Sequence, residues 1–530
     1  MELHPLMRRV TWKEGIGAGL ELGDRWYRLF SLAPIGLLRR ADGCTRAIAA
    51  SVYSLLTNME GIMSRSHEHQ LALKAASFAL PCFAWISLCA VTGCGTSHAA
   101  PNQASDAATP GEAGMATGFE GPNNAVARIV YVGTYTNGPP GRPPLPDGGV
   151  DNGNPASQGI YVFKSDPMDG SLTQVQVVQA TNPSYLALNS TGKFLYACNE
   201  NGSGNYATDM MGGAVSAYSI AADGTLTFLN KLQSMNDWPT FVKVHPGDGF
   251  VYTANYASGT PPGSWTVFKT NSDGSLAMLT DTATGTGNGT GPDSHANGNR
   301  DSTAHAHQMI SDQSGMHLFG VDLGSDRINI YDLDSTTGKL SPNTSPVDGG
   351  LGIPVYAGMP SDTGPRHMVF DKTETHAYVL SEFTSQVFVF DYDATRGALA
   401  YKQAAVGLPT GSDPYMNHAA EIRLHPSGKF LYTTIRGNNA VGMFSVDQTT
   451  GMLTNIGWQP TMGDPQMRQG APGDWPRGMN IDPEGMYLYV GNENSDYVTI
   501  FAIGQTTGKL TYSTKVHTPV PVDIEFGQKL

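Results

Sequence analysis

The sequence predicts an all-β protein, a seven-bladed β-propeller whose ring is closed by the C-terminal strand completing the first blade. One observation is the composition: 63 of the 530 residues are glycine and only 15% are charged, which is typical of short strands joined by tight turns. The other is a repeat in which a strand, a Pro/Gly turn and a second strand ending near an aromatic residue are followed by two more strands. Four alternating strands per repeat are the signature of a propeller blade.

At the start of the chain, residues 63–94 have the order of a secretory signal. Met63 begins a basic segment, residues 75–93 are apolar and uncharged, and Cys94 follows directly. The last four residues, VTGC, resemble a bacterial lipobox, in which the cysteine carries the lipid. We therefore expect an exported protein that is anchored to the membrane only through a lipid on Cys94. An uncleaved single-span anchor is the alternative, and the protein would be cytoplasmic if the signal segment is not used.

The segments on either side of this signal have different roles. Residues 1–62 do not fit in front of it, because a secretory signal normally opens the chain. We interpret them as an upstream extension, with translation starting at Met63. Residues 95–127 are rich in Ala, Gly, Ser, Thr and Pro, which predicts a flexible linker.

Residues 128–530 contain the repeats and are expected to form one propeller domain. Six repeats begin with an intact first strand, at Pro183, Pro239, Ala306, Pro365, Ala419 and Pro476. The seventh is split, because residues 128–164 supply its second and third strands and the C-terminal VPVDIEF has the spacing of its first strand. Pairing these ends in one blade would remove the exposed edges of an open sheet.

Two insertions interrupt the repeat, at residues 137–158 and 283–304. The first joins a second strand to a third, and the other precedes a first strand. Both should therefore emerge at the same end of the ring. We expect them to form a rim or lid over a site there, and disordered excursions are the alternative.

Repeat arithmetic places a polar site at that end. An aromatic residue near the end of each second strand gives the register. The residue twelve positions earlier opens the innermost strand, and this column is Ser184, Thr240, His307, Arg366, Ala420 and Arg477. The residue four positions later leaves the second strand, and this column is Tyr135, Glu200, Tyr256, Leu323, Glu382, Arg436 and Glu493. Both columns should ring one mouth of the central channel.

A structural repeat needs only small or apolar residues at such positions, so the charged members indicate function. Three arginines at one mouth would bind a carboxylate or phosphate through their planar guanidinium groups. The alternative is that they form interblade ion pairs with Glu382, Glu421 and Glu493. His305 and His307 could bind a metal with Asp322, although we expect no metal. His367 and His418 are either neighbours of the site or ordinary shell residues.

Other classes of function lack support. With 32 Lys+Arg against 46 Asp+Glu the formal charge is -14, so a nucleic-acid partner is not expected. Four of the five cysteines lie within the first 94 residues, and Cys198 should be a buried, inert thiol. No GxSxG elbow, P-loop or dinucleotide fingerprint is present, and no cofactor is expected.

Motifs spread over the whole domain carry a family resemblance, among them VGTYT at 132–136, GPRH at 364–367, HAAEIRLHPSGKFLY at 418–432 and WPRGMNIDPEGMYLYVGNENSD at 475–496. They resemble the seven-bladed propeller lactonase family, which includes bacterial 6-phosphogluconolactonases and carboxymuconate lactonizing enzymes. By this resemblance His307, Arg366, Glu382 and Arg436 fall where the family places its active-site groups. Substrate-binding residues are then expected at Glu421, Arg477, Tyr135 and Tyr256.

The resemblance implies a cofactor-free lactone hydrolase acting on a small lactone or carboxylate. Glu382 is the candidate base for water, His307 an alternative proton carrier, and Arg366 and Arg436 the clamps for the oxyanion and the substrate anion. Export favours an unphosphorylated sugar-acid lactone or an aromatic-degradation intermediate. A muconate-type lactonizing reaction and a non-catalytic binding propeller on the cell envelope are the alternatives.

Overall fold

The computed structural model describes residues 124–136, 157–202, 212–257, 262–285, 303–343, 363–409, 411–412, 417–462 and 474–530. The expected upstream extension, the signal segment with Cys94, the linker as far as residue 123 and the central parts of both insertions lie outside these residues. Within the described ranges no helix is long and apolar enough to cross a membrane.

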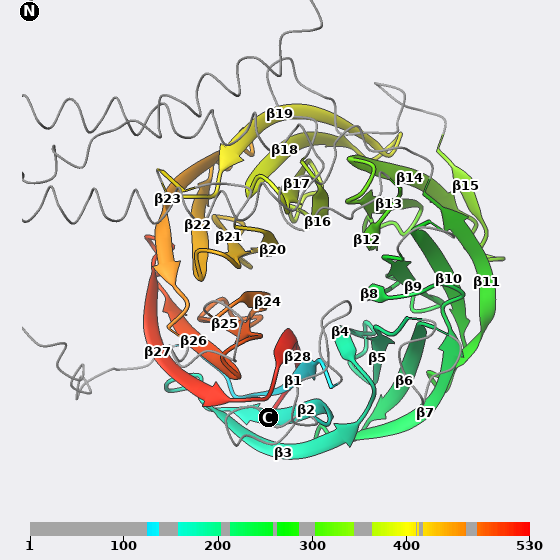
Figure 1. The fold of residues 1–530 in the computed structure, drawn as a ribbon, viewed down its shortest axis with the longest axis horizontal. Coiled ribbons are helices and arrows are strands. Elements are labelled where there is room, and N and C mark those ends of the chain that lie inside the picture. Colours follow the sequence, from blue (N-terminus) through cyan, green and yellow to red (C-terminus); the bar gives the residue numbers. More distant parts are fainter. Residues whose placement is uncertain are drawn as a thin grey trace, which may run out of the picture. The chain divides into compact units, whose positions relative to one another are not determined.

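Seven four-stranded antiparallel sheets surround a central channel, which confirms the predicted seven-bladed propeller (Figure 1). The innermost strands are β28 (Pro521–Lys529), β4 (Pro183–Leu188), β8 (Pro239–Val244), β12 (Ala306–Ser311), β16 (Pro365–Phe370), β20 (Ala419–Leu424) and β24 (Pro476–Ile481). The second strands are β1 (Arg128–Thr134), β5 (Phe194–Asn199), β9 (Phe250–Asn255), β13 (His317–Asp322), β17 (His376–Ser381), β21 (Phe430–Ile435) and β25 (Tyr487–Asn492).

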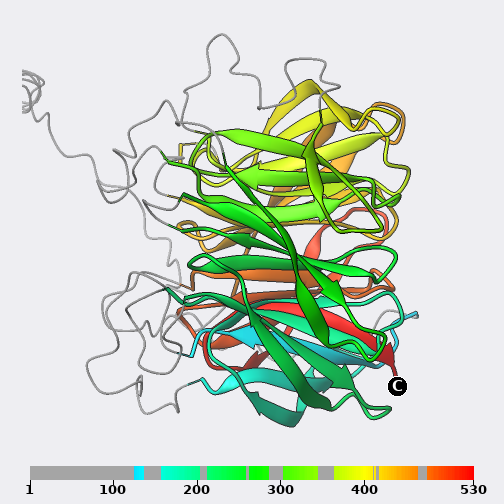
Figure 2. The ribbon, with the colours of Figure 1, turned by 90° about the vertical axis from the view of Figure 1, so that its right-hand side faces the viewer.

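The outer half of each blade completes the sheet, and Figure 2 shows these strands crossing the thickness of the ring. The third strands are β2 (Gly159–Ser165), β6 (Ala214–Ile220), β10 (Ser264–Thr270), β14 (Arg327–Leu333), β18 (Gln386–Asp393), β22 (Ala440–Val446) and β26 (Tyr497–Ile503). The outermost strands are β3 (Leu172–Gln179), β7 (Leu226–Gln233), β11 (Leu276–Thr284), β15 (Leu340–Pro342), β19 (Ala398–Val406), β23 (Leu453–Pro460) and β27 (Leu510–His517).

The first blade is built from both ends of the domain, as the split repeat predicts. Its strand order is β28-β1-β2-β3, and β28 pairs with β1 through partners such as Val130 with Phe526 and Val132 with Ile524. Val130, Val132 and Ile524 are fully buried, so this pairing also fills the core between blades. The C-terminal strand therefore closes the ring and covers the edge that β1 would otherwise expose.

Four of the aromatic residues that mark the register form hydrogen bonds between neighbouring blades. The hydroxyl of Tyr196 on β5 donates to the carbonyl of Gly274, 2.8 Å away in the β10–β11 turn of the next blade. Equivalent bonds join Tyr131 to Gly224, Tyr432 to Gly508 and Tyr489 to Gly170. The glycine is required because its φ is positive, +82° at Gly274, and a Cβ there would lie 2.1 Å from the Phe194 ring.

A β-bulge interrupts each innermost strand near its beginning. In β16, for example, Pro365 pairs with Ser381 and His367 with Leu380, which leaves Arg366 without a partner on β17. The same irregularity occurs at His307 in β12. The bulged positions form the column predicted to open the innermost strands, namely Ser184, Thr240, His307, Arg366, Ala420 and Arg477. Bulges re-aim side chains beside functional sites, and here they turn this column into the channel mouth.

Candidate active site

Glu382 lies at the centre of the charged mouth and binds arginines from two blades. Its Oε2 lies 3.0 Å from Nε of Arg366 in its own blade, and its Oε1 lies 2.7 Å from Nη2 of Arg436 in the next blade. His418 is more distant, with Nδ1 at 3.9 Å from the same Oε1. Arg436 is fixed further by a 2.7 Å bond from Nε to the His418 carbonyl and by the Trp475 ring, whose centroid is 5.4 Å from Cζ. Both oxygens of Glu382 are therefore occupied by cations.

Arg477 forms a second cluster at the same mouth. Its guanidinium lies over the Tyr135 ring, with Cζ 5.1 Å from the centroid. Two carboxylates approach it, Glu200 from the β4–β7 blade at 3.8 Å and Glu493 from its own blade at 3.9 Å. The hydroxyl of Tyr135 donates to Glu200 over 2.8 Å. All three arginines of the mouth are thus ion-paired, with Glu382, Glu200 and Glu493, whereas the salt bridges of Glu421 in the described structure are to His367 and Arg423.

Arg366 lies in the electric field of the other two arginines of the mouth as well as that of Glu382. Burial, together with Arg477 and Arg436, lowers the pKa of Arg366 to about 10 against the opposing effect of Glu382. Burial and Arg477 also lower the pKa of Arg436. Burial, and then Arg366 and His367, hold the pKa of His307 well below its usual value, so His307 is neutral near pH 7. A neutral imidazole beside concentrated guanidinium charge can accept a proton while the arginines stabilise an anion.

A chain of buried polar groups runs inward from His307. Its Nδ1 lies 3.2 Å from Nε2 of His367, whose Nδ1 lies 3.1 Å from Oε1 of Glu421. Arg423 contacts the same oxygen at 2.5 Å through Nη1, and its Nη2 donates to the Tyr185 hydroxyl over 3.0 Å. The first three residues are nearly inaccessible, at 4%, 1% and 1%. We call His307, His367 and Glu421 the axial relay, because all three come from innermost strands.

Tyr256 and His305 lie beside the relay. The Tyr256 ring stacks on His305 at a centroid distance of 4.5 Å and meets His307 edge-on at 5.9 Å. The His305 Nδ1 lies 2.8 Å from the Ala257 carbonyl, and its backbone N–H donates to Asp322. In the described part of the chain, no group of three or more His, Cys, Asp or Glu side chains could hold a metal ion.

Sequence reasoning did not find Arg423, Tyr185 and Trp475 as parts of the site. The only signal for Arg423 is its spacing, because Glu421 and Arg423 place opposite charges two residues apart in AAEIRL, where an innermost strand should be apolar. Cys198 is fully buried, as predicted. Thr136, which directly precedes the first insertion, and the described insertion residues Ser157, Gly285 and Thr303 lie beside strand ends of the charged mouth.

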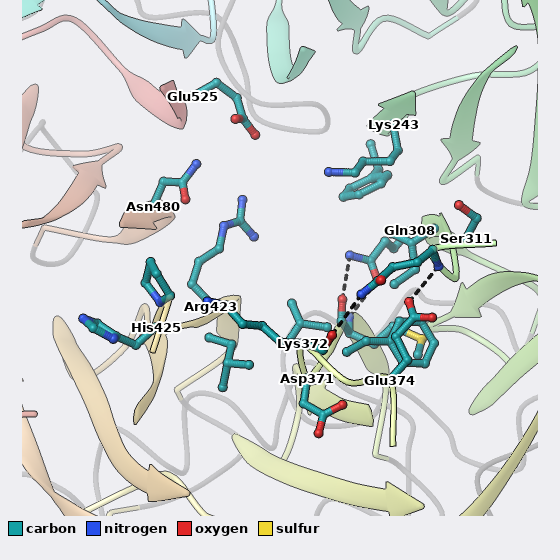
Figure 3. A pocket seen from close by; sticks show the side chains of 18 of the residues that line it. Lys243, Gln308, Ser311, Asp371, Lys372, Glu374, Arg423, His425, Asn480 and Glu525 are labelled. Atoms are coloured by element: carbon teal, nitrogen blue, oxygen red, sulfur yellow. Dashed lines mark hydrogen bonds between the residues drawn. The ribbon is translucent and has the colours of Figure 1, made fainter. Parts of the chain in front are cut away.

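The other end of the channel contains a cavity of about 510 Å³. It is lined by the far ends of innermost strands, including Lys243, Asn480 and Glu525. Figure 3 shows the Arg423 side chain extending into this cavity toward Glu525. The charged mouth and this cavity are therefore connected by the polar side chains that contact Glu421.

Comparison with known proteins agrees with this architecture. The family described as lactonase, 7-bladed beta-propeller, matches residues 129–526. The 6-phosphogluconolactonase of Bacillus subtilis (strain 168) is 29% identical over 403 residues, covering 75% of this chain and 98% of that protein. The 6-phosphogluconolactonase of Formosa agariphila is 28% identical over 385 residues, covering 72% and 94%. The solved periplasmic gluconolactonase of Pseudomonas aeruginosa has a TM-score of 0.64 and 27% identity, covering 76% of this chain and 100% of that one. The chain therefore belongs to the seven-bladed β-propeller lactonase family.

Proposed function

We propose that this protein hydrolyses a sugar-acid lactone at the charged mouth. The observation that carries the proposal is the arrangement of the buried, neutral His307 near Arg366, which is ion-paired through Glu382 to Arg436. Opening a lactone needs a proton acceptor for the attacking water and cationic donors where negative charge develops on the carbonyl oxygen. The family membership and the activities named for its relatives support the same reaction class.

The contacts favour His307 over Glu382 as the base. Both oxygens of Glu382 already contact guanidinium groups, whereas the Nε2 atom of His307 makes no hydrogen bond to any described residue. Glu382 would then orient Arg366 and Arg436 as the oxyanion and substrate clamps. Tyr135, Tyr256 and Arg477 line the remaining mouth as substrate-binding candidates. No step of this reaction needs a cofactor.

The proposed substrate is an unphosphorylated lactone met outside the cytoplasm. Residues 63–94 have the order of an export signal, and a solved relative is named a periplasmic gluconolactonase. A phosphorylated sugar lactone is made inside the cell, whereas an exported enzyme meets neutral sugar lactones. Anchoring through Cys94 is tested by fractionation, since Cys94→Ser should move an anchored protein from the membrane fraction to the soluble fraction.

Activity is tested by acid release from the purified full-length chain. Gluconolactone, 6-phosphogluconolactone and muconolactone are compared in a pH-stat, with the spontaneous rate subtracted. His307→Gln should lower kcat by about 100-fold or more, because a general base typically contributes 10²–10⁴. Glu382→Gln should also lower kcat, since it frees both arginine clamps. Arg396→Gln, which removes an exposed ion pair with Asp393 far from the mouth, is the matched control and should change nothing.

The outcome on the panel separates the candidate functions. Turnover of gluconolactone above that of its phosphorylated form supports the proposed substrate class. Turnover of muconolactone alone would move the assignment to the lactonizing enzymes. No rate above background on any lactone would contradict catalysis and leave a binding propeller.

A further inference from the structure

The proposed reaction gives His367 and Glu421 no role, yet they are among the most buried polar residues of the described structure. Glu421 receives Arg423 at 2.5 Å, its own strand's Ile422 N–H at 2.9 Å and the Tyr185 hydroxyl at 3.3 Å. Buried charges are retained where partners satisfy them, and breaking such a network is costly. The network holds Glu421 facing His367, and not the mouth.

The direction of each hydrogen bond in the axial relay follows from charge. Burial raises the pKa of Glu421, but Arg423 and His367 outweigh it and bring the pKa to about 2, so this carboxylate only accepts hydrogen bonds. His367 must then carry its proton on Nδ1. Burial and Arg366 lower the pKa of His367 to about 4, so the ring is neutral and its Nε2 is an acceptor.

The same reasoning identifies the nitrogen of His307 that carries the proton. Because Nε2 of His367 accepts, Nδ1 of His307 must donate across the 3.2 Å contact. His307 is neutral, so its Nε2 then carries a lone pair. Among the described residues, the ring of His307 makes no hydrogen bond through Nε2. In a free neutral imidazole the proton prefers Nε2, so the relay selects the less common tautomer.

We infer that His367 and Glu421 are positioning residues that hold His307 in the Nδ1–H tautomer, with the Nε2 lone pair directed at substrate. This inference rests on the proposed lactone hydrolysis for its chemical purpose. It reassigns Glu421 from contact with substrate to the support of His307. In a catalytic triad, a carboxylate orients the histidine base and stabilises its imidazolium form. Glu421 would do the same for His307, with His367 as an additional histidine between them.

In the proposed reaction, Nε2 of His307 first accepts a proton and later returns it. Water attacks the lactone carbonyl carbon and gives one proton to Nε2, which makes His307 an imidazolium. The ring carbon–oxygen bond then breaks, and its electron pair goes to the ring oxygen. That oxygen takes the proton from Nε2 and becomes the hydroxyl of the hydroxy acid. Glu421, acting through His367, stabilises the imidazolium between these two transfers.

Nitrogen NMR of the full-length chain tests the tautomer without any substrate. Histidine is labelled with ¹⁵N, and His307→Asn identifies the His307 signals by their loss. The wild type should show a protonated Nδ1 and an unprotonated Nε2 at pH 7. A protonated Nε2 on His307 in the wild type would overturn the inference, whatever the variants do.

Two substitutions of His367 separate positioning from packing. His367→Phe removes the acceptor and should move the His307 proton to Nε2, with kcat falling by about 100-fold and KM changing less than about 3-fold. His367→Gln places an amide oxygen where Nε2 was, so it should keep the Nδ1–H tautomer and recover much of kcat. Equal losses with unchanged tautomers would mean that His367 only packs. Should His367→Phe not fold, Glu421→Gln takes its place and should lower kcat while KM is kept.

The pH profile provides a second readout. The charged or titratable groups facing His307 from the neighbouring elements are Arg366, His367, Glu382, Arg477 and Tyr256. Removing the Glu421 charge should make His307 harder to protonate, so the acid limb of kcat/KM should move to lower pH in Glu421→Gln. If the tautomer is as inferred but no lactone turns over, the proposed function fails and the relay stands. If lactones turn over with the opposite tautomer, the relay fails alone.

Discussion

At the scale of the residue, the site depends on charges that are buried and partnered in pairs. Glu382 joins the arginines of two blades, while Glu421 joins Arg423 to His367 on the channel axis. Removing one member of such a pair leaves an uncompensated buried charge, which costs about 3–5 kcal/mol. Activity losses at Glu382 must therefore be measured beside the unfolding free energy of the same variant.

The axial relay should make the protein sensitive to acid. The folded pKa of His367, about 4, lies below its ordinary 6.5, and that of Glu421, about 2, lies below 4.5. The unfolded chain therefore binds more protons in these windows, and stability present above pH 6.5 is lost as the pH falls. A depression of this size at His367 corresponds to about 3 kcal/mol.

Denaturant titrations between pH 7 and pH 4 measure this loss. The wild type should lose up to about 3 kcal/mol more of its unfolding free energy than His367→Gln over that range. The two proteins are compared by how steeply their unfolding free energy changes with pH. A destabilisation of the variant that is the same at every pH therefore does not affect the result. Parallel pH curves for the two proteins would contradict the depressed pKa of His367.

At the scale of the element, the second strand of four blades is joined to the next blade by a hydrogen bond from its tyrosine. Tyr196→Phe deletes the bond to the Gly274 carbonyl and should lower the unfolding free energy by about 1 kcal/mol. Tyr378 is the matched control, because in the described structure its buried hydroxyl has no hydrogen-bond partner. Tyr378→Phe should not lower the unfolding free energy, because it removes a buried hydroxyl that forms no hydrogen bond. Urea denaturation measures the unfolding free energy of both variants. Equal decreases in the two would show that the hydrogen bond of the Tyr196 hydroxyl does not contribute to stability.

The same tyrosines explain how far the sequence could predict the site. Their regular placement allowed the columns to be counted, and that arithmetic located His307, Arg366 and Arg477 at one mouth. It could not predict that each innermost strand is bulged there. In a regular strand, neighbouring side chains point to opposite faces of the sheet. The bulge allows Arg366 and His367, which are neighbours, to both take part in the site at the channel. The relay joins residues of three blades, and spacing along one strand contains no information on contacts between blades.

At the scale of the whole molecule, the ring brings distant parts of the chain onto one axis. The charged mouth, the axial relay and the cavity at the far end are stacked along the innermost strands, so the position of each depends on the ring staying closed. Closure rests on β28, which pairs with β1 and whose Asp523 accepts the Leu186 N–H of the next blade at 2.7 Å. The last strand of the chain therefore controls the geometry of a site whose proposed catalytic groups all lie in other blades.

Deleting residues 519–530 tests this dependence. The deletion removes β28, exposes the edge of β1 and uncovers the buried faces of Val130 and Val132. The loss should exceed the 5–15 kcal/mol by which domains are typically stable, so the cooperative thermal transition should disappear and the chain should aggregate. Deleting Leu530 alone, an exposed residue directly after the same strand, should preserve the transition within a few degrees. A cooperative transition of normal height in the longer deletion would show that six complete blades hold the ring without the closing strand.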